Sequence, residues 1–245
     1  MDRASFFHAA DSLPLSDVAG LLRGGGLVVI APHADDESLG CGALIAAAAE
    51  RNIPVRIIVV SDGCMSHPNS RLYPRERLRA TRRQEALDAA QALGLAAREV
   101  VFLDLPDANV PSEGEAAESA VQAIVSAAAA VGANALFVTW RGDAHCDHKA
   151  AYALAREAQR RLGGVRLFEY SIWGRDPPGE ALACGPPTGL RFASGAGRAR
   201  KQAAILAHAS QASALIDDDP EGFRIPASMI ADCLARDELF LEMAP

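Results

Sequence analysis

The sequence predicts an α/β fold, with a doubly wound, mostly parallel sheet and helices on both faces of that sheet. Short apolar runs rich in Val, Ile and Leu alternate along the chain with longer segments of helical pattern. The apolar runs are continuous, as expected for strands that are buried on both sides. Half of the 245 residues are hydrophobic, which supplies enough apolar surface for the core of such a sheet.

The order of the expected elements follows directly from this alternation. The strands are expected at 27–32, 55–60, 100–103, 135–140, 165–173 and 238–242. The helices are expected at 38–50, 74–93, 115–131, 148–162 and 198–215. Gly94 and Gly132 follow two of these helices, in the position where glycine commonly ends a helix.

Two Pro- and Gly-rich stretches, 175–179 and 185–189, predict loops at the edge of the sheet. We expect one domain over residues 1–245, with a core of about 25–175 and a C-terminal extension of about 176–245.

Composition excludes several classes of function. The net charge is −7, with 24 basic and 31 acidic residues, which predicts no nucleic-acid partner. No apolar run is long enough for a membrane span, and no signal peptide is expected. The five cysteines form no C-x-x-C pair, so we expect no disulfide framework and a cytoplasmic location.

A first polar cluster directly follows the apolar run 27–30. His33 and Asp36 are three residues apart, so at the start of a helix both side chains can meet one ion, with Asp35 nearby. Imidazole and carboxylate donors suit Zn²⁺, with Fe²⁺, Mn²⁺ or Co²⁺ as alternatives. A simpler interpretation is that the carboxylates only cap the helix and complement its dipole.

A second polar cluster, 143–148, follows the apolar run 135–140 and holds two of the six histidines. Taken alone, it could be a helix start with Asp147 as the N-cap. However, the carboxyl ends of parallel strands meet at one edge of a sheet, where ligands bind. Two such clusters on strand-to-helix turns therefore favour one shared metal site.

The two clusters resemble the signatures of the LmbE-like, or PIG-L, family of N-acetylglucosaminyl deacetylases. Residues 32–37, Pro-His-Ala-Asp-Asp-Glu, match the first signature, P-H-(P/A)-D-D-E, and residues 145–148, His-Cys-Asp-His, match the second, H-x-D-H. Weaker agreement lies at 61–63, 66–68, 82–85 and 105–107. The resemblance implies a Rossmann-like fold and a zinc-dependent hydrolase that removes an acetyl group from a small N-acetylglucosamine-type conjugate.

The resemblance also implies a role for each matching residue. The metal, Zn²⁺ or Fe²⁺, would be held by His33, Asp36 and His148. Asp35 would be the general base, and His145 would stabilise the oxyanion and protonate the leaving amine. Asp147 would sit behind His145, orient it and favour its charged form. Cys146 departs from the proline common in relatives, and we expect its thiol to face away from the metal.

Substrate contacts are less well defined by the sequence. Arg75 and Arg82 belong to an arginine-rich stretch that is mostly a solvated face, and one of them could hold a phosphate or carboxylate of the substrate. Asp107 follows a strand and could bind sugar hydroxyls. Trp140 and Trp173 could stack on a sugar ring, although core packing is the commoner role.

Two other functions compete with the deacetylase. A metallohydrolase of the same fold could act on another N-acyl amide or an ester. A non-hydrolytic nucleotide-binding Rossmann module would need a glycine-rich turn after the first strand, where the carboxylates of this chain would repel phosphate. The substrate, the length of its acyl group, the native metal and the oligomeric state, a homo-oligomer included, stay open.

Overall fold

The structure is a computed structural model that describes residues 1–174 and 185–242. Within these residues a single mixed sheet has the strand order β1-β7-β8-β6-β5-β2-β3-β4, and β8 is the strand that runs antiparallel to its neighbours. The strands are β1 Leu15–Ser16, β2 Gly26–Ala31, β3 Val55–Ser61, β4 Val100–Leu105, β5 Ala133–Thr139, β6 Arg166–Tyr170, β7 Gly189–Phe192 and β8 Glu238–Glu242. The expected loop at 175–179 lies outside the described residues.

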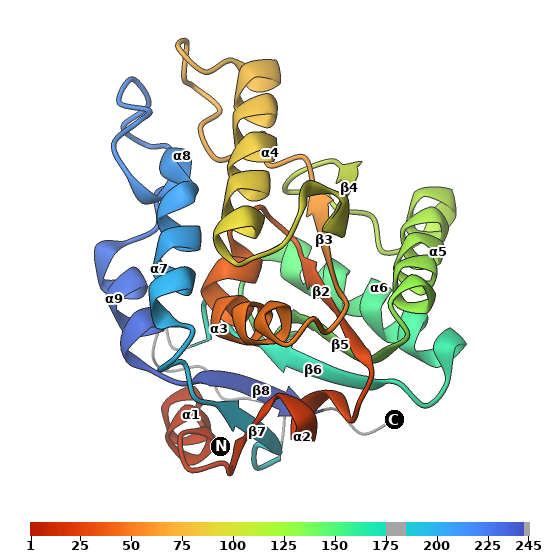
Figure 1. The fold of residues 1–245 in the computed structure, drawn as a ribbon. Helices are drawn as coiled ribbons and strands as arrows, with labels where there is room; N and C mark the ends of the chain where they lie inside the picture. The colour runs from red at the N-terminus through yellow and green to blue at the C-terminus, as the bar shows by residue number, and fades with distance from the viewer. Residues whose placement is uncertain (175–184, 243–245) are drawn as a thin grey trace.

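Helices cover both faces of the sheet, which confirms the predicted fold class (Figure 1). α3, α4 and α7 pack on one face, and α5 and α6 on the other. The helices are α1 Arg3–Ala10, α2 Val18–Leu22, α3 Asp36–Glu50, α4 Arg75–Ala92, α5 Gly114–Ala130, α6 Cys146–Leu162, α7 Arg198–Ala207, α8 Ala209–Ala212 and α9 Ala227–Ala235.

The central strand β2 explains why the apolar runs are continuous. Its side chains alternate between the two faces, so Leu27 and Val29 join the core under α3 while Val28 and Ile30 join the core under α5 and α6. All four residues are fully buried. A polar side chain at any of these positions would lose its water without gaining a partner, so both faces of the strand must be apolar.

The strand order brings the two polar clusters together. From β2 the chain moves outward through β3 and β4, and it then returns to place β5 on the other side of β2. The loops that follow β2 and β5 therefore leave the sheet side by side at its carboxyl edge. This reversal of strand order is where open α/β sheets bind ligands.

Several elements differ from the expectation. The helix expected at 198–215 is divided into α7 and α8 at His208, a fully buried residue whose backbone leaves the helical region. The strand expected to reach Trp173 ends at Tyr170, because Ile172 donates its backbone N–H to Asp143 instead of a strand neighbour. The short α1, β1, α2, β7 and α9 were not anticipated.

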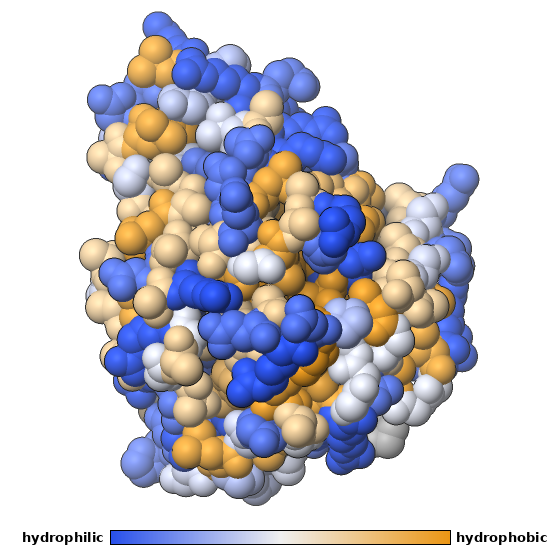
Figure 2. Space-filling view, viewed as in Figure 1, coloured by the Kyte–Doolittle hydropathy of each residue, from blue (hydrophilic) through white to orange (hydrophobic). Residues whose placement is uncertain are grey.

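The face seen in Figure 2 carries polar and apolar residues side by side, and hydrophilic residues predominate at the protruding end near the start of α4. Most of the arginines of α4 are exposed there, as expected for a solvated helix face, and Arg82 is a buried exception. Within the described part of the chain, no helix combines the length and the apolar character needed to cross a bilayer.

Candidate metal and active site

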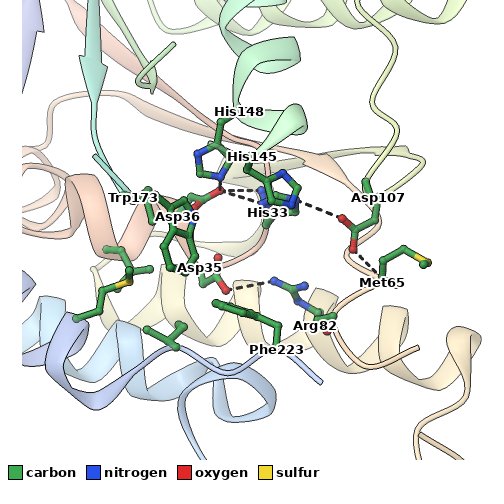
Figure 3. Close-up of a pocket in the computed structure, with 16 residues that line it drawn as sticks. His33, Asp35, Asp36, Met65, Arg82, Asp107, His145, His148, Trp173 and Phe223 are labelled. Atoms are coloured by element: carbon green, nitrogen blue, oxygen red, sulfur yellow. Dashed lines mark hydrogen bonds and ion pairs between the residues drawn. The ribbon is translucent and has the colours of Figure 1, made fainter. Parts of the chain in front are cut away.

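Three side chains from the two strand-to-helix turns lie close together, and we call them the donor triad: His33, Asp36 and His148 (Figure 3). Oδ2 of Asp36 lies 3.4 Å from Nδ1 of His33 and 3.5 Å from Nε2 of His148. Ligands about 2.0–2.2 Å from a tetrahedral ion lie roughly 3.3–3.6 Å apart. Both distances therefore suit two ligands of one small cation, and nitrogen atoms of His33, His148 and His145 also lie within 4.8 Å of one another.

The second nitrogen of each imidazole in the triad faces a carboxylate outside it. Nδ1 of His148 lies 3.0 Å from Asp143, which is itself fully buried. Nε2 of His33 lies 3.2 Å from Asp147 and 3.3 Å from Asp107. Histidines that bind metals are commonly oriented in this way, by an outer carboxylate that accepts the remaining N–H. Asp143 belongs to the second polar cluster of the sequence, but its position there does not indicate this role.

Asp35 stands beside the triad without belonging to it. Its backbone has φ 143°, a strained value for a residue with a side chain, and hydrogen bonds hold it there. Its N–H donates to Glu37 at 3.0 Å, and its carboxylate accepts from Arg82 at 3.2 Å. Glu37 is in turn braced by His208 at 3.0 Å. The side chain of Asp35 is thus fixed at the cavity wall with its charge balanced.

The two adjacent carboxyl groups have opposite pKa shifts. Burial raises the pKa of Asp35 to about 6, although the charge of Arg82 opposes this. Burial also disfavours the charged form of Asp36, but the imidazoles of His148 and His33 outweigh it and lower the pKa of Asp36 to about 2. Neighbouring acids whose pKa values are shifted in opposite directions commonly take separate roles, one as a permanent anion and one as a proton acceptor.

The structure places Asp147 differently from the expectation. Its carboxylate accepts hydrogen bonds from the backbone N–H groups of Ala108 and Val110, at 2.7 and 3.0 Å, and contacts His33. Asp147 contacts His145 through its backbone N–H, and its carboxylate is directed to His33. The reason is local: α6 begins at Cys146, so His145 is the N-cap, and its Nδ1 accepts the backbone N–H of Asp147 at 3.2 Å.

His145 nevertheless faces the site. Its ring centroid is 4.6 Å from that of His33 and 5.4 Å from that of His148. Burial lowers the pKa of His145, and the nearby imidazoles of His33 and His148 lower it further. Asp147 raises the pKa of His145, in the direction expected, but burial and the two imidazoles outweigh it, so the pKa of His145 is lowered.

Cys146 is exposed, and its thiol lies 3.5 Å from the backbone oxygen of Ala108. It can form a loose group of potential ligands with His145 and Asp147, all within 4.8 Å of one another. It does not line the cavity.

Of the three residues expected to bind substrate, two line the cavity and one lies outside it. Asp107 lines the cavity, but its carboxylate already accepts the N–H of Met65 at 2.7 Å and contacts His33. Arg82 also lines it, but its guanidinium donates to backbone oxygens of Ala34 and Gly63 as well as to Asp35. Arg75 lies outside the cavity, is largely exposed and pairs with Asp62 at 3.7 Å.

The cavity has a volume of about 210 Å³ and holds the donor triad, Asp35 and His145. Much of its remaining surface is apolar and comes from residues that the sequence analysis did not single out, Trp173 excepted. Trp140, in contrast, is buried between Phe6 and Phe7 of α1 and takes no part in the site.

Comparison with solved structures finds the same fold in several proteins of low sequence identity. N,N′-diacetylchitobiose deacetylase from Pyrococcus horikoshii matches with a TM-score of 0.68 and 17% identity, over 93% of this chain and 87% of that chain. The hydratase GalB from Pseudomonas putida matches with a TM-score of 0.64 and 18% identity, over 90% and 96% of the two chains.

The zinc-inhibited form of the teicoplanin deacetylase Orf2 matches with a TM-score of 0.57 and 17% identity, over 76% of this chain and 84% of that chain. A deacetylase and a hydratase share this architecture, so the architecture alone does not determine the reaction. A search of curated protein sequences found no match.

Comparison with protein families gives the more specific result. Residues 28–159 match the PIG-L family, described as GlcNAc-PI de-N-acetylase, and this span is more than half of the chain. It includes both polar clusters and every residue of the donor triad. The geometry of the site and this match lead to one conclusion: the chain belongs to the PIG-L, or LmbE-like, family.

Proposed function

We propose that this protein is a metal-dependent N-deacetylase that acts on a small N-acetylglucosamine-type conjugate. The observation that carries the proposal is the two-sided arrangement of His33 and His148. Each ring directs one nitrogen to Asp36 and the other to a carboxylate outside the donor triad. Core histidines rarely need such a double set of partners, whereas metal ligands commonly have it.

The metal would be held by the donor triad, and the mixed nitrogen and oxygen donors suit Zn²⁺, with Fe²⁺ as the alternative. Such an ion, when bound, polarises a carbonyl group and lowers the pKa of a water molecule towards neutrality. Three protein donors leave space for substrate or water, as in other catalytic sites of this type.

Asp35 is the candidate general base. Arg82 and the backbone hold its carboxylate at the cavity wall, and no geometric need makes it a fourth ligand. It would take the proton of the attacking water and then return it to the amide nitrogen, which can leave only once it is protonated. A positioned acid–base group contributes about 10²–10⁴-fold to a rate.

His145 is the candidate donor to the developing oxyanion. Because its Nδ1 accepts the backbone N–H of Asp147, the neutral ring carries its proton on Nε2. That proton is available to the carbonyl oxygen as negative charge develops there. Removal of one such donor typically costs about 10²–10³-fold in turnover.

The test combines metal content with product release. Protein stripped of metal and reloaded with Zn²⁺ or Fe²⁺ should bind about one equivalent and release free amine from at least one of a panel of N-acetylglucosamine derivatives. An N-acetyl amino acid and an aryl acetate serve as controls for another amide or an ester. Cleavage of these controls alone would favour a different metallohydrolase, and failure to bind metal would refute the proposal.

A further inference from the structure

One side of the cavity is an apolar surface, here called the apolar wall, opposite the imidazole donors. We propose that the substrate carries an alkyl or aryl group that packs against this wall while its N-acyl group faces the donor triad. The inference rests on the proposed function and defines its substrate class more closely. The apolar wall consists of Leu39, Ile172, Trp173, Phe223, Ile225 and Met229.

The wall consists of a packed cluster and a pair of aromatic rings. Leu39 and Ile225 belong to one packed cluster, with Ile172 and Met229 against them. The rings of Trp173 and Phe223 meet edge to face, with centroids 5.5 Å apart. Figure 3 shows these two rings on the Asp35 side of the site, away from Asp107.

Phe223 lines the cavity and is 38% exposed. Its backbone N–H donates to the oxygen of Ser66, so the ring is fixed at the edge of the cavity. An exposed ring at the mouth of a cavity costs free energy in the unbound protein, and an apolar ligand would recover that cost.

Two polar side chains that line the cavity, Arg82 and Ser66, already make hydrogen bonds within the protein. Arg82 donates to two backbone oxygens and to Asp35. Ser66 is engaged with His67 and Gln211. A sugar ring laid on the wall would leave its hydroxyls without partners there, a loss that strongly disfavours polar ligands. The wall therefore suits a substituent without hydroxyl groups.

The first experiment compares methyl and hexyl glycosides of N-acetylglucosamine with N-hexanoylglucosamine. Each fully buried methylene improves binding by up to about fourfold, so partial burial should give the hexyl glycoside at least a tenfold higher kcat/KM than the methyl glycoside. A preference for N-hexanoylglucosamine instead would place the apolar group on the acyl side of the amide. Equal kcat/KM values for all three compounds would overturn the inference.

Two variants connect that preference to the wall. Phe223→Ser and Met229→Ser should each reduce the hexyl-to-methyl ratio to below about three. Both should fold, because Phe223 is partly exposed and α9 has no buried residue. The matched control is Leu206→Ser, at an exposed apolar position of α7 outside the cavity, which should leave the ratio unchanged. An unchanged ratio in both wall variants would contradict the proposal.

A binding measurement separates this inference from the proposed function. The sequence has two tryptophans, and Trp173 lies in the wall, so its fluorescence should change on titration with hexyl but not methyl glycoside. Trp173→Phe identifies the source of the signal. Preferential binding without hydrolysis would refute the deacetylase and leave the wall assignment intact. Hydrolysis without any preference, in rate or in binding, would refute the wall assignment alone.

Discussion

The two sides of the cavity, the donor triad and the apolar wall, differ in where their residues come from. The triad is supplied by two strand-to-helix turns, because His33 follows β2 directly, Asp36 opens α3 and His148 lies in the first turn of α6. The strand order brings these two turns together. The wall is collected from residues between 39 and 229, on helices and loops that pack over the edge of the sheet. The triad thus lies where the central strands β2 and β5 end, whereas half of the wall comes from the distant segment 223–229.

The difference suggests how one fold can serve several reactions and substrates. Donors fixed at the carboxyl ends of central strands are hard to alter without loss of the sheet. Peripheral segments tolerate substitution because few other contacts depend on them. The chemistry of the site and its specificity should therefore respond to separate sets of mutations.

The largest effect is expected at the donor triad. His148→Ala should lower metal affinity by more than about 100-fold, which exceeds the loss usual for an outer-shell partner, and abolish turnover. His8→Ala, at an exposed position of α1, is the control and should retain both. Metal analysis after dialysis is the measurement. Full metal occupancy in the His148 variant would exclude it from the ligand set.

A substitution at Asp35 should reduce turnover without reducing metal binding. Asp35→Asn removes the proton acceptor but retains the shape of the side chain, so turnover should fall by about 10²–10⁴-fold. Metal content should stay near that of the wild-type protein. Steady-state kinetics and metal analysis on the same preparation decide the matter, because a variant purified without metal would identify Asp35 as a ligand.

The next prediction concerns the stability of the fold and a buried ion pair between α7 and β8. Lys201 and Glu238 form a buried ion pair at 2.8 Å that connects α7 to β8, so Lys201→Met leaves an uncompensated charge. Loss of one partner from such a pair typically costs about 3–5 kcal/mol. Lys149→Met alters the other lysine of the sequence, which is exposed, and is the control for urea unfolding. Equal midpoints for the two variants would show that the pair adds no stability.

A smaller effect is expected at Asp143, whose carboxylate contacts Nδ1 of His148. Asp143→Asn weakens the orientation of that imidazole, and such changes usually cost about 10–100-fold in metal affinity. Competition with a chelator of known affinity measures the loss. Because Asp143 also accepts from Ser171 and Ile172, the unfolding midpoint should be followed in parallel, to separate loss of orientation from loss of fold.

The smallest effect is expected at Cys146. Cys146→Ser should change metal content and turnover by less than about twofold, because Cys146 is exposed and does not line the cavity. A loss of half the bound metal would show that the thiol is a ligand after all.

The sequence was informative where the function depends on residues close together in the chain. His33, Asp35 and Asp36 share one turn, and β2 and β5 could be recognised from their apolar runs, so the meeting of the two clusters was predictable. The contact of the Asp147 carboxylate with His33 was not predictable, because it depends on the point at which α6 begins and on the N-cap role of His145.

The apolar wall had no comparable signal in the sequence. Ile172, Phe223 and Met229 come from separate segments, and each alone reads as an ordinary apolar residue. Their proximity follows from the packing of α9 and its preceding loop, which no local pattern encodes. The division of the expected helix into α7 and α8 at His208 was unpredictable for a similar reason, because Glu37, the partner of His208, is distant in the chain.

The arrangement of the donor triad around one ion is the central claim, and X-ray absorption at the zinc edge of the reloaded protein tests it most directly. We expect two imidazole nitrogens and carboxylate or water oxygens at about 2.0–2.2 Å, with loss of one imidazole in His148→Ala. A sulfur neighbour at about 2.3 Å, or an unchanged imidazole count in that variant, would contradict it.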